Sequence, residues 1–180
     1  MKKFILSIDQ GTTNSRIILF NTKFQVIDSI QKELKQYFPK NGWVEHDANE
    51  IWESVKKLIK LIIKKNAIIS SQILSIGITN QRETTVLWNK KTGKPVNKAI
   101  VWQDRRTADF CKKLKDTKKE ILIQNITGLI IDPYFSATKI KWIISNNNIA
   151  KKTLKDSNLL FGTIDTWLLW NLTEKKSHLT

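Results

Sequence analysis

The chain has 180 residues, of which 41% are hydrophobic and 26% charged, so it can build a globular core and is neither disordered nor fibrous. Its formal net charge of +15 comes from 27 Lys and only 4 Arg, and the Lys are scattered as pairs along the sequence. Proteins that bind nucleic acid specifically rely on Arg and gather their basic residues on one face. We therefore expect no specific nucleic-acid partner and only weak, unspecific retention on DNA.

A single cysteine, Cys111, excludes an internal disulfide and leaves no thiolate cluster for zinc or iron–sulfur. The apolar start of the chain is interrupted at Asp9, well short of a signal-peptide core. Lys or Asn breaks every later Ile-rich segment before it reaches the length of a membrane span. These features predict a soluble, cytoplasmic protein without a membrane partner.

Short β-branched runs dominate the first hundred residues. They predict strands over residues 4–9, 15–21, 24–35, 72–79, 84–88 and 99–102, the first two forming a hairpin. A helix begins after Asp47, whose side chain is a suitable N-cap with Glu50 three residues later. Its apolar residues recur at helical spacing, which favours packing of one face in the core over binding to a membrane surface.

Helical patterns follow over residues 103–114, 120–126, 136–145 and 165–171, with a strand over 159–161. The three Asn at 146–148 indicate a polar loop. No internal repeat and no Pro- or Ser-rich linker divides the sequence. We therefore predict one α/β domain.

The turn of the first hairpin carries one Gly, three hydroxyl side chains and an Arg, and a carboxylate ends the strand before it, in the segment Asp9-Gln10-Gly11-Thr12-Thr13-Asn14-Ser15-Arg16. Backbone N–H groups and hydroxyls in such a turn can bind phosphate oxygens, and the carboxylate can hold Mg²⁺. The same residues also suit a tight hairpin for backbone reasons alone. The turn matches neither a Walker A loop nor a dinucleotide fingerprint.

A second polar segment, Thr79-Asn80-Gln81-Arg82-Glu83-Thr84-Thr85, lies where one predicted strand ends and another begins. Its adjacent Arg and Glu offer donors and acceptors that suit vicinal hydroxyl groups. Loops at strand ends are where α/β proteins place their sites. The alternative is a polar connection with a surface ion pair of little energetic value.

Two further segments each combine an aromatic residue with polar neighbours. Trp102 precedes Asp104 and Arg105, and its ring can line the C–H side of a carbohydrate-like ligand with those two side chains as polar support. It can equally be a core residue, with Asp104 as a helix cap. Tyr134 precedes a predicted helix, where a phenol often bridges core and solvent.

Together these segments resemble, in identity and in order, the amino-terminal part of the glycerol kinases, which belong to the FGGY carbohydrate kinases and the actin-like ATPase superfamily. The matching blocks are Asp9-Gln10-Gly11-Thr12-Thr13 with Ser15-Arg16, Gly42-Trp43-Val44-Glu45-His46-Asp47, Ile78-Thr79-Asn80-Gln81-Arg82-Glu83-Thr84-Thr85, Val101-Trp102-Gln103-Asp104-Arg105-Arg106, Gly128-Leu129 with Asp132-Pro133-Tyr134-Phe135-Ser136-Ala137-Thr138-Lys139, and Phe161-Gly162-Thr163-Ile164-Asp165-Thr166-Trp167. The Arg-Glu pair after Asn-Gln is what separates the glycerol enzymes from related pentulose kinases.

The resemblance implies a ribonuclease-H-like first domain with a mixed sheet and helices, and ATP bound in a cleft between two such domains. It implies glycerol as substrate, held by Arg82, Glu83 and Tyr134, with Trp102 against its carbon skeleton. It implies ATP or ADP as the nucleotide and Mg²⁺ as the metal. The residues assigned to the nucleotide phosphates are Thr12, Thr13, Asn14 and Arg16, and Asp9 is assigned to Mg²⁺. Asn14 replaces the Ser more usual at its position.

Residues 1–180 correspond to a truncated amino-terminal domain, because the family continues into a stretch that carries the catalytic base and into an adenosine-binding second domain. No carboxylate here suits the base, so we expect a glycerol kinase by descent that is inactive alone. The alternatives are one half of a split kinase that acts only with a separate carboxyl-terminal chain, and a degenerate, non-catalytic piece. The candidate protein partners are a second copy of the chain, in a homo-oligomer, or that carboxyl-terminal chain. Cutting the domain at residue 180 also predicts exposed apolar surface and an unpaired strand edge.

Overall fold

The computed structural model describes residues 2–117 and 119–179. Contacts within the chain divide it into two compact units. The first comprises the residues up to Lys35, Asp47–Gln81 and Ile164–His178, and the second comprises Gln36–His46, Arg82–Thr163 and the end of the chain. The backbone thus passes from one unit to the other repeatedly, within ordinary polar segments that carry no linker signal in the sequence.

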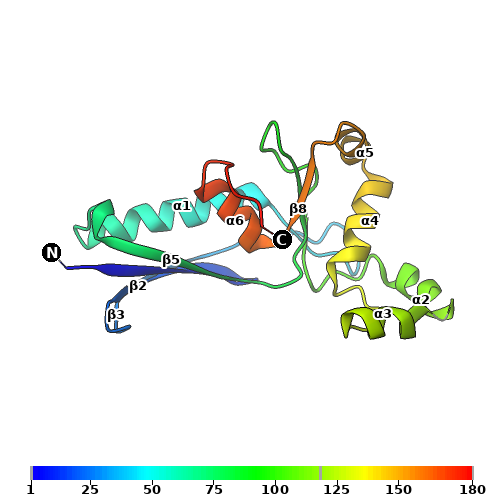
Figure 1. Cartoon of the computed structure of the whole chain (residues 1–180), viewed down its shortest axis with the longest axis horizontal. Helices are drawn as coiled ribbons and strands as arrows, with labels where there is room; N and C mark the ends of the chain where they lie inside the picture. Colours follow the sequence, from blue (N-terminus) through cyan, green and yellow to red (C-terminus); the bar gives the residue numbers. More distant parts are fainter. Residues whose placement is uncertain (1, 118, 180) are drawn as a thin grey trace. The chain divides into compact units, whose positions relative to one another are not determined.

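The first unit is a four-stranded mixed sheet with two helices on one side (Figure 1). Its elements are β1 (Phe4–Gln10), β2 (Asn14–Asn21), β3 (Val26–Glu33), α1 (Ala48–Lys65), the 3-10 turn η1 (Ser70–Gln72), β5 (Ile73–Asn80) and α6 (Ile164–Leu172). The strand order is β3-β2-β1-β5, with β1 antiparallel to β2 and parallel to β5. The predicted first hairpin is therefore confirmed.

Apolar periodicity explains how this sheet and its helices pack. Alternate residues of β1 and β2 are buried on one face, and residues of α1 at helical spacing are buried as well. These core residues are Leu6, Ile8, Ile17 and Leu19 from the strands and Ile51, Val55, Leu58 and Ile62 from the helix. The predicted N-cap is confirmed, since Oδ1 of Asp47 accepts a hydrogen bond from the backbone N–H of Asn49 at 2.9 Å.

β5 is an edge strand of the sheet, with β1 as its only neighbour among the described residues. Two of its apolar side chains, Leu74 and Ile76, are 56% and 43% exposed. The sequence predicted an unpaired strand edge with exposed apolar surface, and β5 has both. Such an edge presents unpaired N–H and C=O groups that can pair with a further strand.

The second unit combines short strand pairs with four helices. Its elements are β4 (Glu45–His46), β6 (Val86–Asn89), β7 (Ala99–Ile100), β8 (Leu159–Gly162), α2 (Ala108–Asp116), α3 (Lys119–Thr127), α4 (Ser136–Asn146) and α5 (Asn148–Lys155). β4 pairs with β7 and β6 pairs with β8, both antiparallel. The core includes Leu87, Val96, Ile100, Ile143 and Ala150.

Two predictions about helices were wrong. α2 begins at Ala108 and not at residue 103, because turns hold the intervening segment: the backbone N–H of Asp104 donates to Val101 O at 3.0 Å. A further helix, α5, follows Asn147 where a polar loop was expected. The side chain of Asn147 is its N-cap, accepting a hydrogen bond from Ala150 N at 3.0 Å, so polar residues that resemble a loop here begin a helix.

A search of residues 2–117 and 119–179 for a membrane span found no helix with the necessary length and apolarity.

Candidate functional site

The hairpin turn between β1 and β2 brings the predicted phosphate-binding residues onto one tight loop. The strand register pairs Asp9 with Arg16 and Gln10 with Ser15, which leaves residues 11–14 to close the turn. The backbone N–H of Gly11 donates to Asn14 O at 2.9 Å. Thr13 is exposed at the tip, and its carbonyl accepts a hydrogen bond from Leu34 N at 2.9 Å.

Gln10 braces this turn from inside the first unit. It is fully buried, and its Nε2 donates to Gly11 O at 3.1 Å and to Asn14 O at 3.4 Å. The hydroxyl of Ser15 donates to Gln10 Oε1 at 2.7 Å. The sequence reading assigned no role to either brace. The sequence signal is strand alternation, which buries Gln10 with Ile8 on β1 and Ser15 with Ile17 on β2, since a polar residue at a core position needs a hydrogen-bond partner.

Asp9 and Arg16 form an ion pair across the β1–β2 ladder. Arg16 Nε donates to Asp9 Oδ2 at 3.1 Å, and Arg16 Nη2 contacts the same oxygen. Within the described ranges no cluster of three or more His, Cys, Asp or Glu residues could hold a metal ion. Mg²⁺ in phosphate sites is commonly held by one or two carboxylates together with phosphate oxygens and water. Asp9, a single carboxylate beside the turn predicted to bind phosphate, fits that kind of site.

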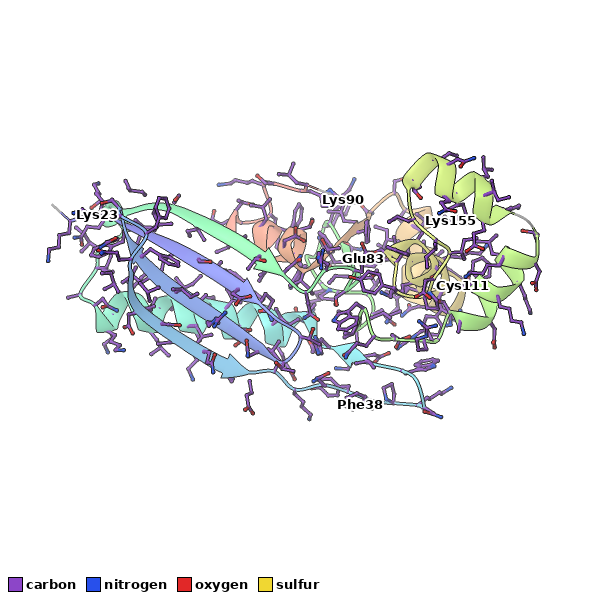
Figure 2. The ribbon with its side chains drawn as sticks, turned by 90° about the horizontal axis from the view of Figure 1, so that it is seen from below. Lys23, Phe38, Glu83, Lys90, Cys111 and Lys155 are labelled. Atoms are coloured by element: carbon purple, nitrogen blue, oxygen red, sulfur yellow. The ribbon has the colours of Figure 1, made fainter. Side chains whose placement is uncertain are left out.

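In the second unit, Glu83 (labelled in Figure 2) has a strained backbone and an anchored side chain. Its φ of 61° lies in the left-handed region, which non-glycine residues seldom adopt. Glu83 Oε2 accepts hydrogen bonds from the backbone N–H of Ser136 at 2.9 Å and from its hydroxyl at 2.6 Å. The start of α4 therefore fixes the carboxylate, while no hydrogen bond to Oε1 is made by the residues described.

Trp102 and Tyr134 lie together in this unit. Their rings meet edge to face with centroids 5.9 Å apart, and Tyr134 contacts Phe135 in the same manner at 5.1 Å. The backbone N–H of Trp102 donates to Thr84 Oγ1 at 3.3 Å, which ties it to the segment that follows Glu83. Arg82 precedes Glu83 and is exposed. The Trp102–Tyr134 ring pair, called the aromatic corner below, and the carboxylate of Glu83 thus come from three segments of the chain.

Lys139 connects these segments and was missed as a functional candidate, although it lies within a quoted motif. It is fully buried, and its Nζ donates to Glu83 O at 2.7 Å and to Tyr134 O at 2.6 Å. Burial is the main cause that lowers the pKa of Lys139 from 10.5 to about 8. The sequence signal is its spacing, because Lys139 lies four residues before the buried Ile143 on α4.

Asp104 supports the backbone next to the aromatic corner. It is buried, and its Oδ2 accepts hydrogen bonds from Val44 N at 2.6 Å and from Arg106 Nη2 at 2.8 Å. The guanidinium of Arg106 lies 3.8 Å from the ring centroid of Trp43. Asp104 is therefore neither polar support for a ligand nor a helix cap, as the sequence allowed, but part of a buried ion pair that fixes this segment.

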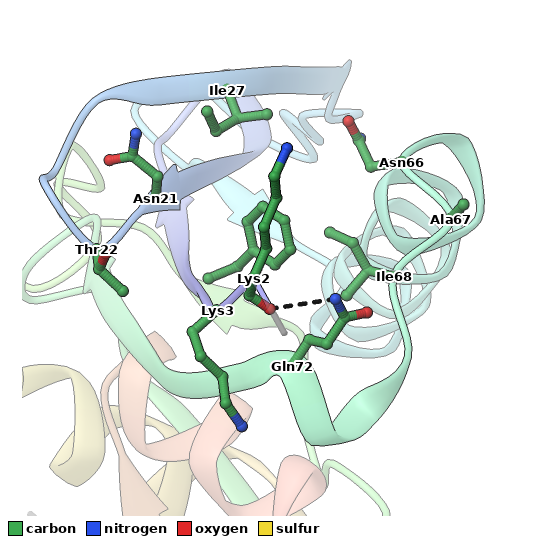
Figure 3. A pocket seen from close by; sticks show the side chains of 10 residues that line it. Lys2, Lys3, Asn21, Thr22, Ile27, Asn66, Ala67, Ile68 and Gln72 are labelled. Carbon is green, nitrogen blue, oxygen red and sulfur yellow. Dashed lines mark hydrogen bonds between the residues drawn. The ribbon is translucent and has the colours of Figure 1, made fainter.

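A cavity of about 580 Å³ opens at the far end of the first unit's sheet, around the start of β1 (Figure 3). Its lining includes Lys2, Asn21 and Gln72, and the Nε2 of Gln72 donates to Lys2 O at 3.1 Å. No predicted site residue lines it. The hairpin turn lies at the opposite end of β1, so this cavity is separate from the candidate phosphate loop.

Comparisons with known proteins agree with these features. Residues 4–180 match the N-terminal domain of the FGGY family of carbohydrate kinases. The chain is 57% identical over 179 residues to a glycerol kinase of Oceanobacillus iheyensis, covering 99% of this chain and 36% of that protein. The chain thus spans about a third of the length of this relative.

Solved structures give the same fold. A Plasmodium falciparum glycerol kinase crystallised with ADP superposes with a TM-score of 0.88 at 36% identity, over 96% of this chain and 35% of that one. A gluconate kinase from Lactobacillus acidophilus superposes with a TM-score of 0.80 at 22% identity, over 94% of this chain and 33% of that one, and supports the fold alone. The expected α/β fold with a mixed sheet and helices is confirmed, and the chain belongs to the FGGY family of carbohydrate kinases.

Proposed function

We propose that this chain provides the glycerol-binding and phosphate-binding parts of an ATP-dependent glycerol kinase, which converts glycerol to glycerol 3-phosphate. The observation that carries the proposal is the cluster of Glu83, Trp102 and Tyr134 within one unit, joined through the start of α4. The identity of 57% to a protein named glycerol kinase supports the same substrate. We assign the activity to the cytoplasm, in keeping with the single, buried Cys111.

Each residue of the cluster has a chemical role that suits a triol. The Trp102 ring packs against the carbon skeleton, where an aromatic face favours C–H groups. Glu83 Oε1 accepts a hydrogen bond from one hydroxyl, because Ser136 already holds Oε2. Arg82 donates to a second hydroxyl, and the phenol of Tyr134 to a third. We therefore propose that this cluster binds a short polyol by hydrogen bonds from Arg82, Glu83 and Tyr134 and by apolar contact with Trp102.

The hairpin turn is the proposed site of the nucleotide's phosphates. Thr12, Thr13 and Asn14 supply backbone and side-chain donors, and Arg16 adds a positive charge. Asp9 would hold Mg²⁺, which when bound neutralises charge on the phosphate oxygens. Arg16 contacts Asp9, so a bound phosphate would compete with Asp9 for the guanidinium.

The transfer joins a terminal hydroxyl oxygen of glycerol to the γ-phosphorus of ATP while the bond from that phosphorus to the bridging oxygen breaks, releasing ADP. The hydroxyl proton passes to a base. Glu83 is held by Ser136 and Asp9 by Arg16, so we assign the base to neither. We propose that the base and the adenosine site belong to the part of a kinase that this chain does not span, and that the chain alone binds glycerol without turnover.

Glycerol binding by the purified chain tests the proposal. Isothermal calorimetry and ligand-observed NMR would compare glycerol with xylulose and gluconate, and a coupled assay would follow glycerol 3-phosphate. We expect the chain to bind glycerol but neither xylulose nor gluconate, and to show no turnover. Glu83→Gln and Trp102→Ala should each weaken glycerol binding. Lys90→Ala, an exposed change in the same unit, should leave binding unaltered. A preference for xylulose or gluconate, or turnover at the rate of an ordinary kinase, would contradict this assignment.

A second candidate function is that of an assembly half, and the open edge of β5 favours it. Mixing the chain with the carboxyl-terminal part of the Oceanobacillus relative should then restore glycerol phosphorylation. Ile76→Lys places a charge on that edge and should prevent the restoration, whereas Lys57→Ala on the exposed side of α1 should not. Failure of the mixture to form a complex would remove this candidate.

A further inference from the structure

We propose that Lys139 is a positioning residue for the glycerol pocket, whose buried ammonium joins the backbones of Glu83 and Tyr134 and so fixes the spacing of their side chains. This rests on the proposed function and adds a residue that does not itself touch the ligand.

The geometry of Lys139 suits this role. Nζ lies 2.7 Å from Glu83 O and 2.6 Å from Tyr134 O, so one side chain ties together two segments that are far apart in the sequence. Both acceptors are backbone atoms. Lys139 therefore holds the two main chains while occupying neither Oε1 of Glu83 nor the phenol of Tyr134.

The backbone of Glu83 needs such a restraint. Its φ of 61° is unfavourable for a side chain with a Cβ, and surrounding contacts must hold a residue in that conformation. Ser136 holds the carboxylate of Glu83, and Lys139 holds its carbonyl. The two anchors come from the same helix, α4, so they move as one body with respect to Glu83.

Packing alone does not require an ammonium at this position. An unbranched apolar side chain of similar length would fill the same space without the desolvation cost of a buried charge. The charged groups that face Lys139 are Glu83, Asp104 and Asp132, which favour its protonated form, and Arg106, which opposes it. The ring of Tyr134 lies 6.0 Å from Nζ. Burial outweighs these acidic neighbours and brings its pKa to about 8.

The test compares Lys139→Met with Lys141→Met, a matched change at an exposed lysine on the same helix. Lys139→Met should remain folded, with a melting temperature within about 4 °C of the original, yet bind glycerol at least about tenfold more weakly because two charge-assisted hydrogen bonds are lost. Lys141→Met should bind as the unaltered chain does. If Lys139 served stability alone, Lys139→Met would lose glycerol binding only to the extent that the variant is unfolded.

A second readout needs no ligand. The chain has only two tyrosines, so ¹³C-labelled tyrosine gives one ring signal for Tyr134 and one for Tyr37 as an internal control. The Tyr134 signal should shift with a midpoint near pH 8, and glycerol affinity should fall over the same range, because deprotonation weakens both hydrogen bonds. Burial raises the pKa of Cys111 above its ordinary 9.0, so that thiol titrates above this range. Lys139→Met should abolish the shift.

The outcomes separate the two proposals. If the unaltered chain binds no glycerol, the proposed function fails, and the Tyr134 titration alone decides the role of Lys139. If glycerol binds but Lys139→Met binds it equally well, or if the Tyr134 signal does not change between pH 7 and 9, the positioning role is overturned. Should Lys139→Met fail to fold, the titration of the unaltered chain still gives the answer.

Discussion

The hairpin proposed to bind phosphate and the cluster proposed to bind glycerol are built in different ways. The hairpin is formed by consecutive residues, and its main brace, between Gln10 and Ser15, lies within the same two strands. The proposed glycerol site gathers Glu83, Trp102 and Tyr134 from separate segments, and Lys139 joins the backbones of Glu83 and Tyr134. The hairpin should therefore tolerate substitutions elsewhere in the chain. The proposed glycerol site, in contrast, should be sensitive to substitution of buried polar residues that touch no ligand.

The largest expected effect comes from Asp104→Ala. The substitution removes the carboxylate that pairs with both Nε and Nη2 of the buried Arg106, which then keeps Glu45 at 2.8 Å as its carboxylate partner, and it leaves Val44 N without an acceptor. Breaking a buried ion pair in this way lowers the free energy of unfolding by about 3–5 kcal/mol. Urea unfolding followed by tryptophan fluorescence would measure the loss.

The difference between the hairpin and the proposed glycerol site leads to two expectations for Asp104→Ala. Glycerol binding should be lost while the hairpin still binds pyrophosphate, because the pair lies in the second unit and the hairpin in the first. Arg105→Ala is the control: its ion pair with Asp132 is exposed and should contribute less than about 1 kcal/mol. Simultaneous loss of both ligands in Asp104→Ala would show that the two regions are not independent.

The next effect concerns pH. Because the pKa of Lys139 is lowered to about 8, the unfolded chain binds more protons than the folded chain between pH 8 and 10.5. The free energy of unfolding should therefore rise with pH in that window, by about 3 kcal/mol for a shift of this size. Subtracting the same curve for Lys139→Met isolates this contribution from other alkaline titrations. Parallel curves for the two proteins would contradict the lowered pKa.

The sequence predicted the hairpin well because strand alternation and turn composition are local properties, and Asp9, Thr12, Thr13 and Arg16 all lie in one short segment. The residues proposed to bind glycerol were also named from contiguous motifs, and that assignment remains a prediction. Their connection through Lys139 was not, since a lysine in an amphipathic helix ordinarily faces solvent and only the tertiary structure shows that this one is buried.

Two features of the fold escaped prediction for related reasons. The helix α5 begins within a run of three asparagines, where the same side chain chemistry suits a loop or an N-cap. The division into two units left no mark because the chain crosses between them without a linker. Contacts between distant segments decide both whether Asn147 caps a helix and where the two units meet along the chain. A local sequence pattern does not reveal such contacts.

A smaller effect is expected from Ser15→Ala in the hairpin. It removes the 2.7 Å hydrogen bond to Gln10 Oε1 and leaves that buried oxygen without its hydroxyl donor. The free energy of unfolding should fall by about 1–2 kcal/mol. Pyrophosphate affinity, measured by ³¹P NMR, should fall with it because the turn loses its brace, while glycerol affinity should not change. An equal loss of glycerol affinity would contradict the independence of the two regions.

The smallest effect on stability, and the sharpest on binding, is expected from Asp9→Asn. The ion pair with Arg16 is partly exposed, with the two side chains 29% and 44% accessible, so its loss should change the free energy of unfolding by less than about 1 kcal/mol. The amide keeps the shape of the carboxylate but loses the charge that attracts Mg²⁺. Pyrophosphate binding should then no longer be strengthened by Mg²⁺, although metal-free pyrophosphate still binds. Asp28→Asn is the matched control, because Asp28 is an ion-paired carboxylate of the same sheet that lies on β3, outside the turn. If both variants retained the response to Mg²⁺, Asp9 would not be the metal ligand and the hairpin would bind phosphate through Arg16 and its backbone alone.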